Sequence, residues 1–313
     1  MPFPHKQGSR LNTPDSPVSS TGQACQARND KTVVIRFVTY EPIGKGGGRE
    51  IPEPIKTGQI LRHEVDLLVV SDPAAVAQEA AKQVVAIAEK AVARCGRFTV
   101  ALAGGSTPKR LYSLLTAEPY CTRLPWRGTH IFWGDERAAP PEHPDSNFGM
   151  ARATLLSRVP IPANQVHRMQ AERTDLDAAA SEYESEIAKV FEIRETDEPP
   201  MFDLILLGLG SDGHTASLFP YTPALQETKR WVVSNYIPKL KVNRLTLTPP
   251  ILNRASTILF LVSGADKASV LQAVLEGPPD PERLPAQLIR PLGGQLVWLV
   301  DQTAASRLGD RAP

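Results

Sequence analysis

Cysteine is scarce in this chain of 313 residues, and its three copies form no pattern. Cys25, Cys95 and Cys121 are odd in number and far apart, without the close pairing of a metal or redox motif. This usage speaks against a disulfide framework and against a zinc ribbon. A reducing, cytoplasmic setting fits it best, with the cysteines serving as small apolar fillers or surface thiols.

Excess charge and long apolar runs are also lacking. The formal net charge is +1 with 22% charged residues, which gives no indication of a nucleic-acid partner or an anionic membrane surface. No apolar run approaches the roughly 20 residues that span a bilayer. The 42% of hydrophobic residues is ordinary for a globular protein with a sizeable core.

Residues 1–57 differ in composition from the rest. The first 31 are rich in Pro, Ser, Gln and Asn without apolar periodicity, so we expect a disordered N-terminal extension. TVVIRFVTY (32–40) can form a strand, but the glycine-rich GKGGGRE that follows reads as a linker without P-loop spacing. Neither a secretory signal nor a transit peptide fits the segment. We expect one domain over 58–305 and a C-terminal tail over 306–313.

From about residue 58, apolar runs alternate with helical patterns. Helices are expected over 73–95, 109–117, 148–157, 175–192 and 266–276, and strands at EVDLLVV, RFTVALA, THIFW, FDLILL, WVVS, RLTLT, TILFLV and QLVWLV. Continuous apolar strands between helices indicate an α/β fold with a mainly parallel sheet covered on both faces. Ligands of such folds bind beyond the carboxyl ends of the strands, so the loops there are the candidate sites.

The loop AGGSTP follows the strand RFTVALA. Gly104 and Gly105 let the backbone approach a ligand, and Ser106 and Thr107 offer hydroxyl and amide groups at the start of a helix. This arrangement suits an anion, most naturally a phosphate. A tight turn with a Ser or Thr cap is equally typical of the sequence, and the spacing is not that of a dinucleotide fingerprint.

Two further sets of charged residues follow strands. Asp135, Glu136 and Arg137 open what reads as a long polar loop, GDERAAPPEHPDSN. Arg137 can clamp a phosphate bidentately, and Asp135 or Glu136 can bind sugar hydroxyls or hold that arginine. A solvated loop is the plainer interpretation. Arg244, on or beside a strand, and Lys267, opening a helix, are surface cations or parts of the same cationic pocket.

The loop of FDLILLGLGSDGHTASLFP places Asp212 and His214 among three glycines. A neutral histidine is suited to general-base catalysis near neutrality. Gly210 and Gly213 leave room for substrate and can aim amides at developing negative charge, and we expect a helical turn from Thr215. A histidine that bonds loop carbonyls is the structural alternative. No second histidine or cysteine lies at the spacing of metal ligands. His130 and His167 are interpreted as structural.

Taken together, VALAGGSTPKRLY, FWGDERAAPPEHPDSNFGMA, IPANQVHRM, FDLILLGLGSDGHTASLFP, RLTLTPPILNRA and GADKA resemble 6-phosphogluconolactonases over about residues 60–305. The resemblance implies a Rossmann-like parallel sheet, related to those of glucosamine-6-phosphate deaminase and ribose-5-phosphate isomerase. It also implies hydrolysis of 6-phospho-D-glucono-1,5-lactone in the pentose phosphate pathway, with no metal or organic cofactor. The partner would be this small sugar-phosphate lactone, and the protein a monomer or small homo-oligomer.

The resemblance assigns roles residue by residue. His214 matches the catalytic histidine that activates water, with Asp212 orienting it or the loop. Gly105, Ser106 and Thr107 match the phosphate loop, and the cationic positions fall on Arg137, Arg244 and Lys267.

Two other functions remain open from the sequence. The deaminase and isomerase branch shares the DGH loop but continues DGHIAFNEP, with a glutamate that assists ring opening, where this chain has Leu218, Phe219 and Pro220. A non-catalytic sugar-phosphate sensor would normally carry a DNA-binding module, and residues 1–57 hold neither a helix-turn-helix pattern nor a basic stripe.

Overall fold

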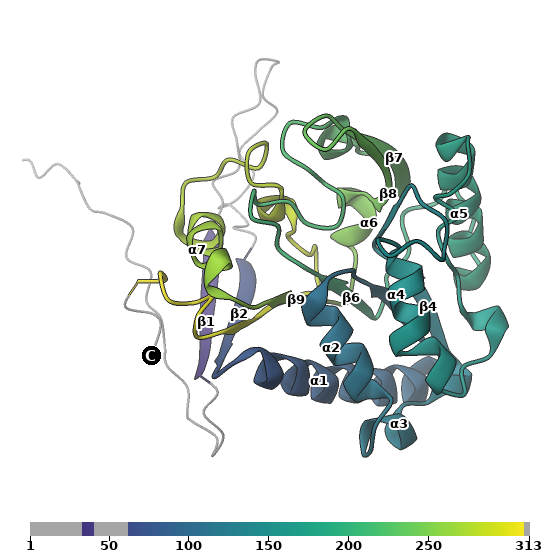
Figure 1. The fold of residues 1–313 in the computed structure, drawn as a ribbon, viewed down its shortest axis with the longest axis horizontal. Helices are drawn as coiled ribbons and strands as arrows, with labels where there is room; N and C mark the ends of the chain where they lie inside the picture. The colour runs from purple at the N-terminus through teal and green to yellow at the C-terminus, as the bar shows by residue number, and fades with distance from the viewer. Residues whose placement is uncertain (1–32, 41–61, 310–313) are drawn as a thin grey trace, which may run out of the picture.

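The central element of the computed structural model, which describes residues 33–40 and 62–309, is a seven-stranded sheet (Figure 1). Its strand order is β1-β2-β10-β9-β6-β3-β4. All neighbours are parallel except β1 and β2, which are antiparallel. The predicted α/β fold with a mainly parallel sheet is therefore confirmed. The bounds are β1 Val33–Tyr40, β2 Arg62–Val70, β3 Phe98–Leu102, β4 Thr129–Trp133, β6 Leu204–Leu207, β9 Thr257–Val262 and β10 Gln295–Asp301.

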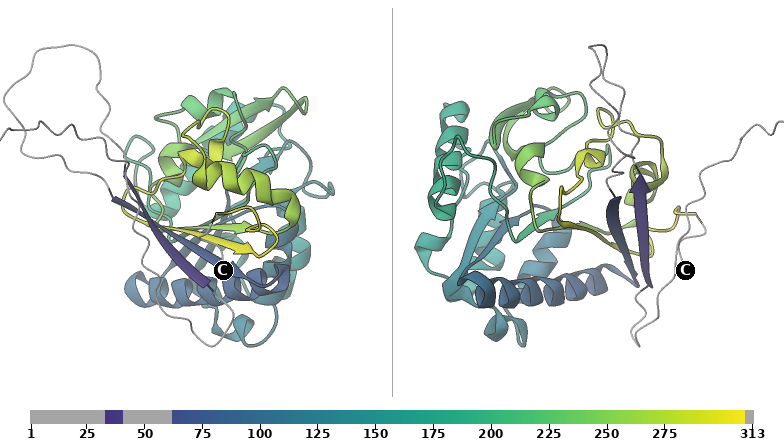
Figure 2. Two further views of the ribbon diagram at one scale, coloured as in Figure 1. Left: turned by 90° about the vertical axis from the view of Figure 1, so that its left-hand side faces the viewer. Right: turned by 180° about the vertical axis from the view of Figure 1, so that it is seen from behind.

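Helices cover the sheet. Helix α1 (Pro73–Cys95) begins at Asp72, whose carboxylate accepts hydrogen bonds from two first-turn amides, and ends at Gly96 in the left-handed conformation. It packs against β3, β9 and β10. The left view of Figure 2 shows α1 on one side of the sheet and α7 on the other. The remaining helices are α2 Ser106–Leu115, α3 Tyr120–Arg123, α4 Asn147–Thr154, α5 Leu176–Phe191, α6 Pro249–Leu252 and α7 Ala268–Glu276.

The strand β1 corrects the expectation of disorder over residues 1–57. Val33–Tyr40 pairs along its whole length with β2, in register from Val33 opposite Val69 to Tyr40 opposite Arg62. Its β-branched and aromatic composition outweighs the neighbouring glycine-rich segment, because an apolar strand gains a full ladder at the open edge of β2. The rest of the proposed extension lies outside the described residues.

A second, three-stranded antiparallel sheet was not predicted. Its order is β5-β8-β7, formed by Asp135–Arg137, Val242–Leu247 and Val232–Ile237. The sequence DER was expected in a loop, and β7 and β8 were expected as strands without a sheet of their own. Helix α5 packs against β7 and supports this sheet (Figure 1). The assignment of strands to separate sheets depends on pairing between distant segments, which local periodicity does not encode.

Two smaller expectations also need correction. No helical turn begins at Thr215, because 211–222 is a series of turns with an isolated antiparallel bridge between Thr215 and Leu218. The proposed C-terminal tail is packed at its start, since Leu308 is buried and the Gly309 amide donates to Glu276 on α7. Among the described residues, no helix has the length and apolar character needed to cross a membrane.

Candidate active site

Asp212 and His214 form a hydrogen-bonded pair in the loop that follows β6. The Nδ1 atom of His214 lies 2.5 Å from Asp212 Oδ1, and the side chains are 29% and 23% exposed. This hydrogen bond lowers the pKa of Asp212 to about 2, against the opposing effect of its partial burial. Asp212 is therefore an ionised acceptor that fixes one ring nitrogen and leaves Nε2 of His214 for chemistry.

The glycines explain how the ring is accommodated. A Cβ atom on Gly210 would lie 1.9 Å from His214 Nδ1, so only glycine leaves space for the ring. The ring also stacks on Phe219 with a centroid distance of 3.9 Å. The imidazole thus packs against both a bare backbone and an aromatic side chain.

The amides of this loop do not serve the role expected of them. The Gly210 N–H donates to the carbonyl of His214 at 2.8 Å, and the Gly213 N–H donates to the carbonyl of Gly210 at 3.0 Å. Gly213 also has φ of 83°, a left-handed conformation, and a Cβ there would meet Leu284. Both amides are committed to shaping the turn, so the expectation that they face developing charge is wrong for this conformation.

The GGST segment lies at the carboxyl end of β3, which is the neighbour of β6 in the sheet. Gly105, with φ of 107°, is the N-cap of α2, and no side-chain cap bonds the first turn. The alternative of a Ser or Thr cap is therefore wrong, and Ser106 and Thr107 are the first two helical residues. Parallel neighbours bring this loop and the His214 loop to the same edge of the sheet.

Gly104 has a different reason for being glycine. A Cβ atom there would lie 1.9 Å from Asn147 Oδ1, so its backbone packs directly against the Asn147 side chain. Asn147 in turn donates to the carbonyl oxygen of Asp135 at 2.8 Å. Close approach at Gly104 therefore serves contact with α4, and it joins the GGST loop to β5.

Arg137 and Arg244 are brought together by the second sheet. They are directly opposite each other on β5 and β8. Among the described residues, Arg137 Nε and Arg244 Nε and Nη1 are buried without a hydrogen-bond partner. Burial first, and then the charge of Arg137, lower the pKa of the Arg244 guanidinium. Unpartnered buried donors on two cations are typical of a site for an anion.

Asp135 and Glu136 have structural contacts in place of the sugar contacts that were considered. The Asp135 carboxylate is 8% exposed and accepts from Ser217 Oγ at 2.7 Å and from Asn147 Nδ2 at 3.2 Å. Glu136 accepts from the amides at the start of α4, and burial raises its pKa. The two carboxylates therefore fasten neighbouring segments to β5.

Lys267 pairs with its neighbour in the chain. It follows β9 in a short 3-10 turn, and its Nζ is 3.3 Å from Asp266 Oδ2. His130 and His167 are structural, as predicted: they are 3.1 Å apart through Nδ1 and Nε2, and His167 also contacts Glu186 at 2.7 Å. Burial lowers the pKa of each histidine.

Residues that the sequence reading did not assign hold the site together. Ser217 and Asn147 both contact Asp135, and Thr246 and Asn235 contact Ser217. Ser217, Asn147 and Thr246 stand in motifs that were recognised and Asn235 does not, yet for all four only the contacts between distant segments reveal the partner. The available signal in the sequence was the two-residue spacing of Asp135 and Arg137 and of Arg244 and Thr246, which is the spacing of residues on one face of a strand.

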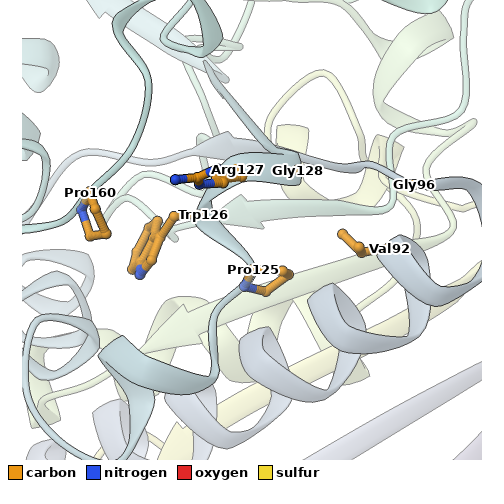
Figure 3. A pocket seen from close by; sticks show the side chains of 7 residues that line it. All are labelled: Val92, Gly96, Pro125, Trp126, Arg127, Gly128 and Pro160. Carbon is orange, nitrogen blue, oxygen red and sulfur yellow. The ribbon is translucent and has the colours of Figure 1, made fainter.

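Two cavities lie beside the strands and helices described above. One of about 500 Å³ lies at the amino ends of β3 and β4, between Val92, Gly96, Trp126, Arg127 and Gly128 (Figure 3). It is at the opposite edge of the sheet from His214, and it contains no group suited to acid–base chemistry. Another of about 680 Å³ adjoins Asp212 and Phe219 and is bounded by α7 and the turn after β7. Within the described residues no three His, Cys, Asp or Glu side chains are arranged to hold a metal ion.

Comparison with known proteins identifies the family of the chain. The model of the family "Glucosamine-6-phosphate isomerases/6-phosphogluconolactonase" matches residues 71–298. A 6-phosphogluconolactonase of Synechocystis sp. is 47% identical over 220 residues, which cover 70% of this chain and 88% of that protein. A probable chloroplastic 6-phosphogluconolactonase of rice is 39% identical over 251 residues, covering 77% and 76% of the two chains.

Solved structures of similar fold include a member of this family. The 6-phosphogluconolactonase of Trypanosoma brucei superposes with a TM-score of 0.69 at 30% identity, covering 78% of this chain and 98% of that one. A monomeric glucosamine-6-phosphate deaminase superposes with a TM-score of 0.63 at 22% identity, covering 77% and 99%. The second likeness concerns the fold alone.

Proposed function

The chain belongs to the glucosamine-6-phosphate isomerase/6-phosphogluconolactonase family, and on that premise we propose that it hydrolyses 6-phospho-D-glucono-1,5-lactone to 6-phospho-D-gluconate. The observation that carries this proposal is the Asp212–His214 pair, 2.5 Å apart, at the carboxyl end of β6. Its position at the ligand edge of a parallel sheet suits a catalytic base. The relatives named above, which carry this activity in their names, support the choice of substrate.

His214 acts as the general base in this proposal. Its Nδ1 donates to the ionised Asp212, so Nε2 takes a proton from the water that attacks the C1 carbonyl of the lactone. The tetrahedral intermediate collapses with cleavage of the bond between C1 and the ring oxygen. The protonated His214 returns its proton to that oxygen, which leaves as a hydroxyl group. Asp212 stabilises the imidazolium throughout.

The phosphate of the substrate is assigned to the arginine pair and the GGST loop. Arg137 and Arg244 supply buried N–H donors, and charge-assisted bonds to a phosphate would satisfy them. Gly105, Ser106 and Thr107 supply the uncapped first turn of α2, which favours an anion. Lys267 belongs to the same proposal as a cation in the loop after β9, where its Nζ now pairs with Asp266.

Glucosamine-6-phosphate deamination is the alternative on this fold. The residues after His214 argue against it, because Phe219 stacks on the imidazole and Leu218 is buried. No carboxylate stands in DGHTASLFP after Asp212 to assist ring opening. A sugar-phosphate sensor is the other alternative, and the Asp212–His214 geometry, which binding alone does not require, favours catalysis over it.

A comparison of substrates tests the proposal. The lactone is generated in situ and its disappearance is followed directly, beside parallel assays of glucosamine 6-phosphate deamination and of 6-phosphogluconate binding. We expect acceleration of lactone hydrolysis over buffer and no ammonia release. Deamination without lactone hydrolysis would indicate the deaminase function, and binding without either reaction would indicate a sensor.

A further inference from the structure

One face of the second sheet carries both the arginine pair and the attachment of the catalytic loop. In antiparallel sheets, opposite residues point to the same face, as do residues two apart along a strand. Asp135 is opposite Thr246, and the next pair on that face is Arg137 opposite Arg244. On the third strand, Asn235 stands opposite Arg244. These five side chains therefore share one face.

Ser217, three residues after His214, is bound to this face at three points. Its hydroxyl donates to Asp135 Oδ2 at 2.7 Å, and its amide donates to Thr246 Oγ1 at 3.1 Å. Its carbonyl accepts from Asn235 Nδ2 at 2.9 Å. Ser217 is 1% exposed and Asn235 2% exposed, so water does not compete for these bonds.

The GGST loop is joined to the same carboxylate from the other side. Asn147 packs its amide against the backbone of Gly104 and donates to Asp135. Asp135 is therefore the group that the phosphate loop, through Asn147, and the catalytic loop, through Ser217, have in common. The β5–β8 ladder holds Asp135 two residues from Arg137, on the same face of the sheet as both arginines.

We propose that Ser217 and Asp135 are positioning residues that set the distance between His214 and the phosphate-binding arginines. This inference rests on the proposed function, because it concerns how a substrate held by its phosphate meets the base. Ser217 touches no reacting atom and acts through the backbone that leads to His214. We call the contact between Ser217 and Asp135 the clamp. The distance between the phosphate and C1 of the substrate must match the separation that the clamp sets, so the clamp also makes the site selective for the length of the substrate.

The position of the base matters more for turnover than for binding. A base displaced by about 1 Å can cost a factor of roughly 100 in rate. Loss of the Ser217 hydroxyl leaves Arg137 and Arg244 on their strands, so phosphate affinity should not change. We therefore expect kcat to fall and the inhibition constant of 6-phosphogluconate to stay the same.

Ser217→Ala is the test variant, and Thr99→Ala is its matched control. Thr99 is equally buried, and its hydroxyl donates to the buried carboxylate of Asp203 at 2.8 Å, near the amino end of β3. Both variants lose one buried hydroxyl–carboxylate bond, and Thr99→Ala also loses the acceptor of the Asp203 amide, so it is the more demanding control. We expect Ser217→Ala to lower kcat by roughly 10- to 100-fold, and Thr99→Ala to keep kcat within about twofold. The inhibition constant should stay within about twofold in both.

Two results would overturn the clamp: a kcat for Ser217→Ala that equals that of Thr99→Ala, or a rise in the inhibition constant as large as the loss of kcat. If Ser217→Ala does not fold, Thr246→Val removes the acceptor of the Ser217 amide at similar volume and is judged by the same criteria.

The NMR signals of the His214 ring provide a readout without turnover. They should shift or broaden in Ser217→Ala and remain as in the wild type in Thr99→Ala. Unchanged signals in Ser217→Ala would contradict the clamp even for an inactive protein. Absence of wild-type lactone hydrolysis would instead contradict the proposed function, so the two failures are distinguishable.

Discussion

Arg137 and Arg244 stand directly opposite each other on neighbouring antiparallel strands. Like charges in this position destabilise a sheet, and burial of unpartnered guanidinium donors adds to the cost. Asp135 and Glu136, the acidic residues closest in sequence, use their carboxylates on other partners. Such an arrangement sacrifices stability for a ligand, and in our account that ligand is the substrate phosphate.

Replacement of Arg244 by methionine separates the cost of the arginine pair to stability from its contribution to substrate binding. Arg244→Met removes the like-charge contact at similar length, so we expect the unfolding midpoint to stay the same or rise. A lost hydrogen bond to a charged group is worth about 1.5–3 kcal/mol, so KM should rise roughly 10- to 150-fold. Urea unfolding and steady-state kinetics measure both quantities.

Arg254→Met is the control for the arginine substitution. Arg254 pairs with Glu198 at the surface, away from the strands of the second sheet, so its KM should not change. A clear fall in the stability of Arg244→Met together with an unaltered KM would make the arginine pair a structural feature only.

Gly210→Ala tests the space for the catalytic ring. The added methyl group would lie 1.9 Å from His214 Nδ1, so the ring cannot keep its present position. We expect kcat to fall by at least about 100-fold, in line with a misplaced base. Gly293→Ala, at an exposed glycine with nothing within 4 Å of the new methyl group, controls for glycine replacement in general. Equal activities of the two variants would mean that the ring position does not limit catalysis.

The low pKa of Asp212 predicts the form of the pH dependence. Its folded pKa, about 2, is below the ordinary 3.8 because the carboxylate bonds to His214. The stabilisation from this ion is therefore complete above pH 3.8 and lost only as the pH falls through 2. Asp212 therefore stays ionised between pH 4 and 7, and we expect it to add no ionisation of its own to the acid limb of kcat/KM in that range.

Asp212→Asn tests whether Asp212 contributes an ionisation to the fall of kcat/KM at acidic pH. We expect the variant to have a kcat at least about tenfold lower, since the base loses its orienting partner. The slope of its acid limb of kcat/KM should equal that of the wild type. A wild-type slope of two that becomes one in Asp212→Asn would show that Asp212 titrates in this range, against our account. Asp197, a partly exposed carboxylate that pairs with Arg194 three residues away, provides the control substitution to asparagine.

The parts of the fold that local rules govern were predictable. The capping residue Asp72 and the left-handed Gly96 delimit α1 where the sequence indicates, and the apolar run of β6 is wholly buried. The second sheet was not predictable, because β5 contains three charged residues and no apolar alternation. Its stability comes from pairing with β8 and from carboxylates that bind α4, which are contacts across more than ten positions in the chain.

The same holds for the site: features within one segment were predictable, and contacts between distant segments were not. The positions of His214, Asp212 and the GGST loop after buried strands were predictable because strand-to-loop transitions are visible in the sequence. The contacts of Asp135 were misjudged because the partner, Ser217, is 82 positions away. The roles of Gly210 and Gly104 also differ from expectation, since each accommodates a neighbouring side chain.

The most direct test of the account is lactone hydrolysis by the wild type and His214→Ala, with His143→Ala, a half-exposed histidine whose ring contacts Asp145 and has no role in our account, as control. Removal of a general base should slow turnover by roughly 10²- to 10⁴-fold. We therefore expect His214→Ala to approach the spontaneous rate, while His143→Ala matches the wild type. Retention of wild-type turnover by His214→Ala would contradict the central claim that this histidine activates the attacking water.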